Sequence, residues 1–233
     1  MLLNVVQFSG GKDSTCMLLM MLEKGMRVDK IIFCDTGMEF PQMYEHIKKV
    51  DDYIFENYGK RIETIREERG FNYWMFDHIK TRGKYKGKQG YGWATMGIRW
   101  CTTLLKQQVA SKFLRELKEP YTNYIGIAYD EPKRHAKKAE NVVHPLFDWG
   151  ITEKQALEYC YSKGFNWGGL YDHFNRVSCW CCPMKSMSEL KTLYEKYPDL
   201  WNKLKEMDNK SYNQFKSNYS VQDLEDKFLT NSK

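Results

Sequence analysis

The sequence predicts an α/β fold, a doubly wound, mostly parallel sheet of five strands with a helical, cysteine-bearing C-terminal part. Two observations lead to this prediction. Short apolar and β-branched runs alternate with segments of helical period through the first 150 residues, which is typical of a parallel sheet covered by helices. From residue 152 onward the chain becomes helical and aromatic. We therefore expect an α/β domain over residues 1–150 and a helical extension over residues 151–233, packed as one unit.

The first 65 residues are expected to form three strands and two helices. Apolar runs predict strands at residues 2–8 and 30–35, and a shorter run predicts a third strand at 61–65. Residues 15–26 predict a helix that follows a glycine-rich turn. Apolar side chains recur with a helical period over residues 41–57 and predict the second helix.

The middle of the chain interrupts this alternation and then resumes it. Residues 66–99 are rich in glycine, lysine and aromatic residues and predict one long loop, of a length that is often functional. Leucines on one face predict a helix over residues 100–118, and the fourth and fifth strands are expected at 123–128 and 141–143. The remaining expected helices are 152–163, 187–196 and 199–208, followed by a polar final segment from residue 211.

Composition narrows the class of protein. The 233 residues are 42% hydrophobic and 28% charged, as in an ordinary globular protein. No apolar run approaches the roughly 20 residues that cross a bilayer, and no secretory signal is visible, so we expect a cytoplasmic protein without a membrane partner. Seven cysteines in a reducing compartment indicate metal ligands or reactive thiols rather than disulfides. A net charge of +6 permits an anionic partner without requiring one.

The most informative motif is Ser-Gly-Gly-Lys-Asp-Ser at residues 9–14, directly after the first predicted strand. Glycines allow backbone amides to approach an anion, and the following helix presents unpaired N–H groups to it. Lys12 adds a positive charge, and Asp13 could cap the helix or help to place a metal ion. The spacing differs from that of the P-loop. The alternative is a plain β-turn. The predicted phosphate-binding residues are Ser9, Gly10, Gly11, Lys12, Asp13 and Ser14.

This motif resembles the PP-loop of the ATP pyrophosphatases, which split ATP between the α- and β-phosphates, usually to adenylate an acceptor. Later segments resemble the phosphoadenosine phosphosulfate (PAPS) reductase group of that fold, so that the resemblance spans roughly residues 4–183. They are the Asp35-Thr36 segment up to Pro41, the block of Arg99, Cys101 and Lys106, the stretch from Gly126 through Asp130 to Arg134, and the stretch from His144 to Glu153.

The resemblance implies an adenine nucleotide alpha hydrolase-like fold that binds ATP with Mg²⁺. Matched residue by residue, it implies Lys12, Ser14 and Arg134 as catalytic residues. It adds Asp35, Thr36, Gly126 and Asp130 to the nucleotide-binding set. The chain departs from the family pattern at Gln42-Met43, where Glu-Thr is usual, and at Ala128, where arginine is common.

Two further departures bear on the reaction. Phosphosulfate reductases generally have a degraded loop, whereas residues 9–14 are complete, which favours ATP. The reductases also carry a catalytic cysteine in a C-terminal tail, and this chain has no cysteine after Cys182. We expect an ATP pyrophosphatase or adenylating transferase that serves sulfur transfer to nucleic acid. A sulfonucleotide (PAPS/APS) reductase and a non-catalytic nucleotide-binding subunit of a larger complex remain alternatives.

The cysteines form the second strong pattern. Cys179-Trp180-Cys181-Cys182-Pro183 contains a C-x-x-C pair that ends in proline. Four thiolates would hold a [4Fe–4S] cluster or a Zn²⁺ ion, and free thiols or a redox pair are the remaining alternative. Cys16 and Cys34 are expected to be core residues. The predicted ligands are Cys101, Cys160, Cys179 and Cys182, with Cys181 in reserve.

The loop over residues 80–99 alternates lysine and arginine with glycine and tyrosine. Phosphate contacts with stacking on Tyr85, Tyr91 or Trp93 would suit nucleic acid. A lid over ATP and a solvated loop are the alternatives. The expected partners are ATP, a nucleic-acid acceptor, a sulfur-donor protein and a second copy of the chain. The resemblance implies a bacterial or phage source.

Overall fold

The computed structural model describes residues 1–177 and 179–230. It divides into two compact units, each assembled from segments that are distant in the sequence. Unit 1 comprises residues 1–35, 40–65 and 109–172, and unit 2 comprises residues 36–39, 66–108 and 173–233. These units do not part at the expected boundary between residues 150 and 151. The chain already enters unit 2 twice before residue 109.

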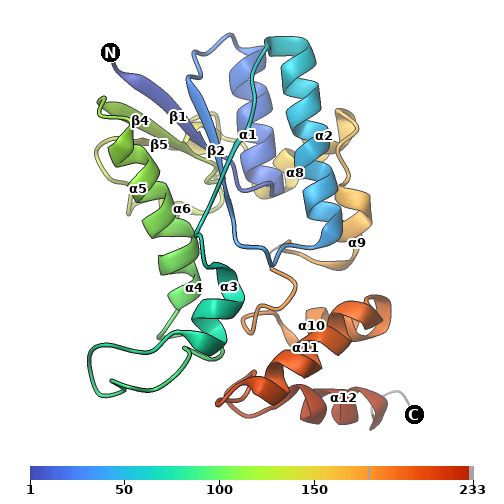
Figure 1. The fold of residues 1–233 in the computed structure, drawn as a ribbon. Helices are drawn as coiled ribbons and strands as arrows, with labels where there is room; N and C mark the ends of the chain where they lie inside the picture. Colours follow the sequence, from blue (N-terminus) through green and yellow to red (C-terminus); the bar gives the residue numbers. More distant parts are fainter. Residues whose placement is uncertain (178, 231–233) are drawn as a thin grey trace. The chain divides into compact units, whose positions relative to one another are not determined.

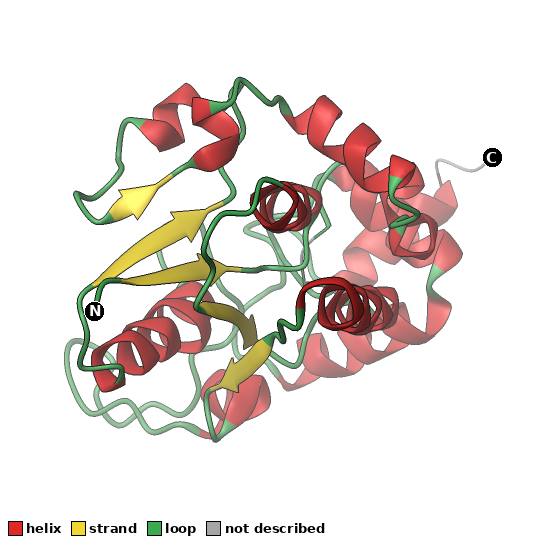
Figure 2. Cartoon of the chain, turned by 90° about the horizontal axis from the view of Figure 1, so that it is seen from above, coloured by secondary structure: helices red, strands yellow, loops and turns green. Residues whose placement is uncertain are grey.

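Unit 1 contains the predicted five-stranded sheet. The strand order is β3-β2-β1-β4-β5, and β1 pairs in parallel with both of its neighbours, as does β4 with β5. The strands lie side by side in Figure 2. The doubly wound α/β class is therefore confirmed. The strands are β1 (Leu3–Gln7), β2 (Lys30–Asp35), β3 (Glu63–Arg66), β4 (Tyr121–Ile125) and β5 (Val142–Val143).

Helices cover both faces of the sheet, as Figure 1 shows for α5 on one side and α1, α2 and α8 on the other. Leu114 of α5 packs against Val5 of β1 and Ile32 of β2. On the opposite face, α1 packs against α2, α7 and α8. The α-helices of unit 1 are α1 (Lys12–Glu23), α2 (Pro41–Tyr58), α5 (Gln108–Glu116), α6 (Pro132–His135), α7 (Pro145–Asp148), α8 (Glu153–Ser162) and α9 (Leu170–His173), and a 3₁₀ turn, η3 (Trp167–Gly169), precedes α9.

The first helix begins three residues earlier than the sequence predicts. Gly11 is its N-cap, so Lys12, Asp13 and Ser14 form the first helical turn instead of a preceding loop. Asp13 is favourable there because its negative charge faces the positive end of the helix dipole. The helix also ends early, at Glu23, because Gly25 adopts a φ of 66° and stops it.

Unit 2 is mostly helical and contains a helix that the sequence analysis missed. The expected polar segment after residue 211 includes α12, where Val221, Leu224 and Phe228 are buried on one face. The segment predicted as a long loop contains a short helix and a π-helical turn. The elements of unit 2 are α3 (Gly70–Asn72), η1 (π, Tyr73–Asp77), α4 (Trp100–Thr102), η2 (π, Thr103–Gln107), α10 (Met187–Lys196), α11 (Pro198–Lys210) and α12 (Val221–Thr230).

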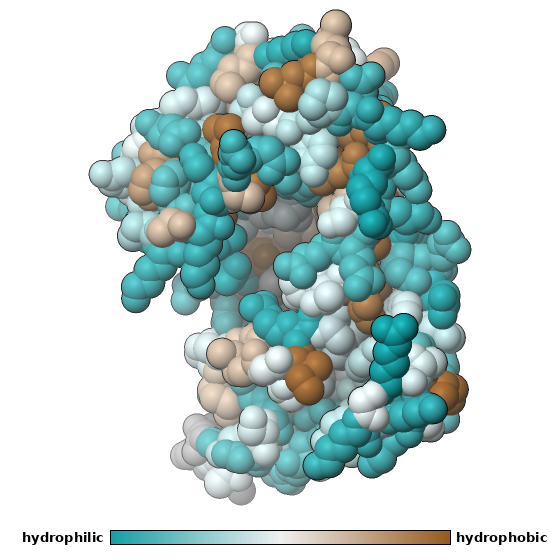
Figure 3. Space-filling model, turned by 90° about the vertical axis from the view of Figure 1, so that its left-hand side faces the viewer, coloured by the Kyte–Doolittle hydropathy of each residue, from teal (hydrophilic) through white to brown (hydrophobic). Residues whose placement is uncertain are grey.

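The face of the molecule drawn in Figure 3 is largely polar. Hydrophilic side chains dominate the face seen in Figure 3, and apolar side chains are scattered among them. Within residues 1–177 and 179–230, no helix is long and apolar enough to span a membrane.

Candidate functional site

The glycine-rich loop at residues 9–14 lies where the strand order reverses. β1 is flanked by β2 on one side and β4 on the other, so the loops that leave β1 and β4 meet at the carboxyl edge of the sheet. Gly126, just after β4, packs directly on the peptide between Asp13 and Ser14. A Cβ atom at Gly126 would lie 2.9 Å from the Asp13 carbonyl carbon and from the Ser14 nitrogen. Such a switch point is the usual ligand site of an open α/β sheet.

The loop is braced from within by its two serines. The Ser14 hydroxyl donates to the Gly11 carbonyl at 3.0 Å and accepts a hydrogen bond from the Ser9 amide at 3.1 Å. The hydroxyls of Ser9 and Ser14 lie 3.0 Å apart. The N-cap residue of α1, Gly11, has no side chain with which to cap the helix. The first turn of this helix therefore keeps the amide dipoles that favour an anion.

Two aromatic residues from the end of unit 1 fix the loop from outside. The indole N–H of Trp167 donates to the Gly10 carbonyl at 2.7 Å, and the Lys12 amide donates to the Tyr171 hydroxyl at 2.9 Å. His46 of α2 stacks on Trp167 with ring centroids 4.2 Å apart. Gly10 needs its φ of 78°, and a side chain there would meet the Met43 sulfur at 2.8 Å. The loop conformation is thus set by residues from three separate parts of the chain.

Lys12 is buried and held between carboxylates. Its ammonium group lies 2.6 Å from Glu153 and 3.3 Å from Asp13. Glu153 begins α8, where its backbone amide donates to Asp130 at 3.0 Å and a Thr152–Gln155 capping box starts the helix. Asp130 therefore acts on the site through Glu153, whose carboxylate forms an ion pair with Lys12.

Asp13 carries an unsatisfied carboxylate oxygen. Its Oδ1 is buried and has no hydrogen-bond partner among the described residues. Burial raises the pKa of Asp13 to about 6, against the opposing effect of Lys12 and with a further increase from Glu153. A buried carboxylate oxygen without a hydrogen-bond partner, beside the glycine-rich loop, fits Mg²⁺, which is commonly held by one or two carboxylates together with substrate phosphates.

Three other predicted residues lie outside this cluster of contacts. Arg134 forms a two-pronged hydrogen bond with Glu131, at 2.6 and 2.8 Å. Asp35 is buried at the end of β2 and accepts a hydrogen bond from Tyr44 at 2.8 Å. Thr36 belongs to unit 2, where its hydroxyl lies 3.4 Å from Glu39 Oε1.

Four thiols belong to unit 2 and influence one another. Burial, and after it the neighbouring Cys182, raises the pKa of Cys101. Burial, and after it the neighbouring thiols, raises the pKa of Cys181 well above its usual value. The Cys179 sulfur lies 3.5 Å from Glu39 Oε1. Among the residues that the structure describes, no three His, Cys, Asp or Glu side chains are grouped closely enough to hold a metal ion. In chemical type, the four thiols match the ligand set of an iron–sulfur or zinc site.

Cys160 differs from these four. It belongs to unit 1, is fully buried in α8, and donates to the Lys12 carbonyl at 3.5 Å. Side-chain hydrogen bonding with the neighbouring Cys16, together with burial, raises the pKa of Cys160. The predicted ligand set therefore combines residues of different units, and the thiol that unit 2 adds to Cys101, Cys179 and Cys182 is Cys181.

Sequence reasoning missed most of the residues that surround the loop. Glu153, Trp167 and Tyr171 were given no role, nor was His46, whose Nε2 lies 3.1 Å from the Thr15 hydroxyl. The Thr152-x-x-Gln155 pattern could have placed Glu153 in the first turn of a helix. Nothing in the sequence near Trp167 or Tyr171 indicates a contact with residues about 160 positions earlier.

Residues 3–185 match the family model of the phosphoadenosine phosphosulfate reductase domain. The chain belongs to this family. The loop at residues 9–14, Gly126 and the thiols of unit 2 all lie within the matched segment.

The chain is also similar to two uncharacterized proteins of Methanocaldococcus jannaschii. One is 30% identical over 220 residues, covering 85% of this chain and 40% of the relative, and the other is 29% identical over 206 residues, covering 84% and 45%. An uncharacterized nin region protein of Escherichia phage lambda is 31% identical over 147 residues, which are 57% of this chain and 50% of the phage protein. The chain thus spans about half the length, or less, of these relatives.

Among solved structures, the chain is similar to a phosphoadenylyl-sulfate reductase from Candida auris, determined as a phosphate complex. The match has a TM-score of 0.49 and 17% identity, and it covers 76% of this chain and 81% of the reductase chain.

Proposed function

We propose that the chain binds ATP at the loop of residues 9–14 and cleaves it to AMP and pyrophosphate while adenylating an acceptor. One observation carries this proposal. The complete loop lies at the switch point of the sheet and joins the N-terminus of α1, where the N-cap residue Gly11 has no side chain and Lys12 is buried. These features together suit a polyphosphate. Membership in the PAPS reductase family supports an adenine nucleotide as the ligand.

In this proposal Lys12 exchanges Glu153 for the phosphate oxygens that become pyrophosphate. Charge-assisted contacts of this kind act mainly by positioning and by stabilising charge that develops on the leaving group. The serine hydroxyls keep the loop in shape, and Arg134 would leave Glu131 to reach phosphate. Bound Mg²⁺, held by Asp13 and the phosphates, would neutralise charge on the leaving pyrophosphate. Asp35 and Gly126 complete the proposed nucleotide site.

The acceptor that we propose is a nucleic acid, which receives sulfur after adenylation. We propose that Cys101, Cys179, Cys181 and Cys182 of unit 2 are the ligands of a [4Fe–4S] cluster. Structural zinc at the same four cysteines is the alternative. Anaerobic purification followed by iron, sulfide and zinc analysis tests this assignment. Cys181→Ser is expected to lose metal, whereas Cys160→Ser is expected to keep it. Metal loss in Cys160→Ser with metal retention in Cys181→Ser would contradict this assignment and favour the ligand set predicted from the sequence, which has Cys160 in place of Cys181.

Product analysis tests the pyrophosphatase proposal. Purified protein is incubated with Mg²⁺, α-labelled ATP and candidate acceptors, and AMP, AMP adducts and pyrophosphate are quantified. Lys12→Ala is expected to lower turnover roughly 10²- to 10³-fold, as for removal of a charge-stabilising donor. Lys48→Ala, at a lysine whose side chain is 78% exposed, is the matched control. ADP and phosphate as the only products would refute cleavage between the α- and β-phosphates.

A second candidate is a sulfonucleotide reductase, which the family match favours. Thioredoxin-dependent release of sulfite from PAPS or APS would identify this activity. A third candidate is a nucleotide-binding subunit without turnover, which the greater length of the relatives favours. Saturable ATP binding without AMP or pyrophosphate, together with partners that co-purify, would identify that role.

A further inference from the structure

We propose that unit 2 binds single-stranded nucleic acid, with one unpaired base in a cavity beside Trp180 and the neighbouring phosphates on the lysine-rich hairpin of residues 79–89. The inference deepens the proposed function, because it gives the acceptor a binding site. All of the residues involved belong to unit 2.

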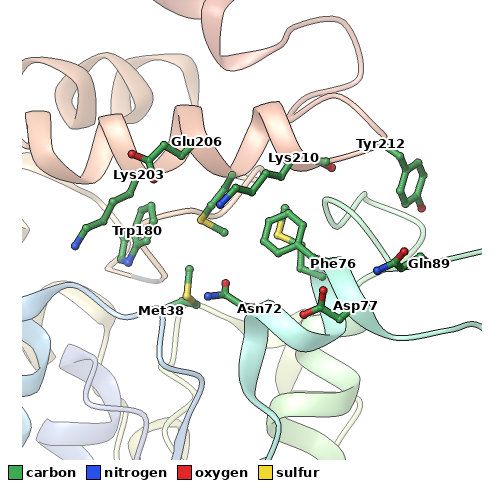
Figure 4. A pocket seen from close by; sticks show the side chains of 13 residues that line it. Met38, Asn72, Phe76, Asp77, Gln89, Trp180, Lys203, Glu206, Lys210 and Tyr212 are labelled. Carbon is green, nitrogen blue, oxygen red and sulfur yellow. The ribbon is translucent and has the colours of Figure 1, made fainter.

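The cavity has a volume of about 760 Å³ and lies within unit 2. This volume is in the range of pockets that take small organic molecules. Figure 4 shows α11 on one side, α3 and the π-helical turn η1 on the other, and Trp180 at one end. Phe76 projects into the space between them. The flat apolar groups at its wall suit a flat, aromatic ligand.

Polar groups around the same cavity suit the edge of a base. The side-chain amides of Asn72 and Gln89 line it, and neither has a protein hydrogen-bond partner within the described part of the chain. An amide offers both a donor and an acceptor, which is what the hydrogen-bonding edge of a nucleobase requires.

The charges of the cavity argue against a phosphate as its occupant. Lys203 and Lys210 of α11 are matched by Glu206 and Asp77. The lining therefore carries no formal net charge, so a polyanion gains little by entering it. An uncharged base with hydrogen-bonding edges suits this balance better.

Positive charge is concentrated instead on the adjoining hairpin. Residues 78–108 contain seven lysines and arginines and no aspartate or glutamate. An antiparallel bridge joins Ile79 to Gln89, and the residues between them carry five of the seven cations. Tyr85 is 49% exposed and lies beneath the ammonium groups of Lys80, Lys84 and Lys88, at 5.5, 6.0 and 5.5 Å. Exposed cations around an aromatic ring are typical of surfaces that bind single strands.

The end of the hairpin where its two strands join the rest of unit 2 is held by hydrogen bonds and forms part of the cavity. Gly90 donates to the His78 carbonyl at 2.8 Å, and a Cβ atom there would lie 2.3 Å from the Met75 carbonyl oxygen. Lys80 donates to the Tyr212 hydroxyl at 3.2 Å, and Tyr212 itself lines the cavity, as does Gln89. A strand whose phosphates lie on the hairpin therefore has a base within reach of the cavity.

The other two aromatic residues that the sequence suggested for stacking, Trp93 and Tyr91, instead contact other residues of the protein. The Trp93 indole donates to Asp208 at 2.8 Å and its side chain is buried. Tyr91 stacks between His78 and Trp100, at 5.3 and 5.7 Å. Of the three rings that the sequence suggested, Tyr85 on the hairpin therefore stays exposed, and Phe76 supplies a further ring in the cavity.

Fluorescence anisotropy of the full chain with end-labelled 12-nucleotide single strands of RNA and of DNA, without ATP, tests the inference. Two variants separate its two parts. Lys84→Ala/Lys86→Ala/Lys88→Ala is expected to reduce the slope of log affinity against log salt by about 2, since each phosphate contact contributes about 0.7. Phe76→Ala is expected to weaken binding roughly 5- to 100-fold, as for loss of one base–aromatic stack.

Matched controls give each variant a distinct reading. The triple change Lys154→Ala/Lys191→Ala/Lys196→Ala alters the charge equally and is expected to leave the salt slope unchanged. An oligomer of abasic sugar phosphates is expected to bind the wild type more weakly than the matching oligonucleotide does. It is expected to bind the wild type and Phe76→Ala with equal affinity. Circular dichroism melting confirms that each variant is folded.

Several outcomes would overturn the inference. They are equal binding of duplex and single strand, equal loss with both lysine triples, or a Phe76→Ala effect that persists with the abasic oligomer. Binding to anionic lipid vesicles but to neither oligonucleotide would assign the hairpin to a membrane surface instead. Because the assay contains no ATP, its outcome is independent of the pyrophosphate assay, so either proposal can fail without the other.

Discussion

Replacing His46 should remove a large part of the acid sensitivity of unit 1. His46 is buried, stacks on Trp167 and lies 3.1 Å from the Thr15 hydroxyl. Burial and the charge of Lys49 lower its pKa from 6.5 to about 3. The folded state therefore holds this imidazole neutral at a pH where the unfolded chain protonates it.

The sign and size of the effect follow from proton linkage. A histidine with a lowered folded pKa binds more protons when unfolded, so its contribution to stability is complete above pH 6.5 and falls as the pH falls towards 3. The loss is about 1.4 kcal/mol per pH unit below 6.5. Between pH 7.5 and pH 5, His46 should therefore cost about 2 kcal/mol of unfolding free energy.

Asp13 acts in the opposite direction and must be separated from this effect. Its folded pKa is raised to about 6, so its contribution is present at low pH and is lost as the pH rises through that value. The wild-type pH profile alone would mix the two groups. The difference between the wild type and His46→Phe isolates the imidazole, because Asp13 is present in both.

The assay is urea denaturation followed by far-UV circular dichroism at pH 7.5 and pH 5. We expect His46→Phe to lose about 2 kcal/mol less than the wild type between the two values. His173→Phe, at an exposed histidine, controls for the removal of an imidazole. Equal losses in the wild type and His46→Phe would mean that this ring is not held neutral by burial, and the reasoning would be refuted.

Two further predictions concern packing. Gly126→Ala places a methyl group 2.9 Å from the backbone of the glycine-rich loop, so we expect about 1–3 kcal/mol of destabilisation and, if the proposed site is correct, weaker ATP binding by calorimetry. Gly97→Ala, where a Cβ meets nothing within 4 Å, is its control, and an equal effect of both would show that the close approach is unimportant. Phe228→Ala should cost about 3–5 kcal/mol in chemical denaturation, because Phe228 is buried against Trp201 in unit 2. Its neighbour Leu229, which is 53% exposed, should tolerate alanine with little loss, and similar losses at both would contradict the position of α12.

Local sequence signals located much of the fold and the centre of the site. β2 lies where the β-branched run predicts it, and α10 matches residues 187–196 from end to end. The glycine-rich turn after the first strand correctly identified the switch-point loop. These features depend on short contiguous patterns, such as alternation, helical period and turn residues. They can therefore be predicted without knowing the fold.

Other local signals misled because a tertiary contact outweighed them. The final segment reads as polar, yet three apolar residues at helical spacing bury one face of α12. The stretch from residue 100 to 118 has one helical period, yet the structure passes through a π-helical turn within it. Trp93 reads as an exposed stacking residue but is bonded to Asp208 instead.

The sequence by itself determined the family, the parallel α/β architecture and the position of the glycine-rich loop after the first strand, because each depends on residues that are adjacent or regularly spaced. Only the tertiary structure decided which distant residues complete the site. It brought Glu153 and Tyr171 to Lys12, placed Gly126 on the loop, and assigned Cys160 to a different unit from Cys181. The physical reason is that side-chain contacts across more than a hundred residues depend on how the sheet is wound and how its helices pack, and no short pattern in the sequence encodes them.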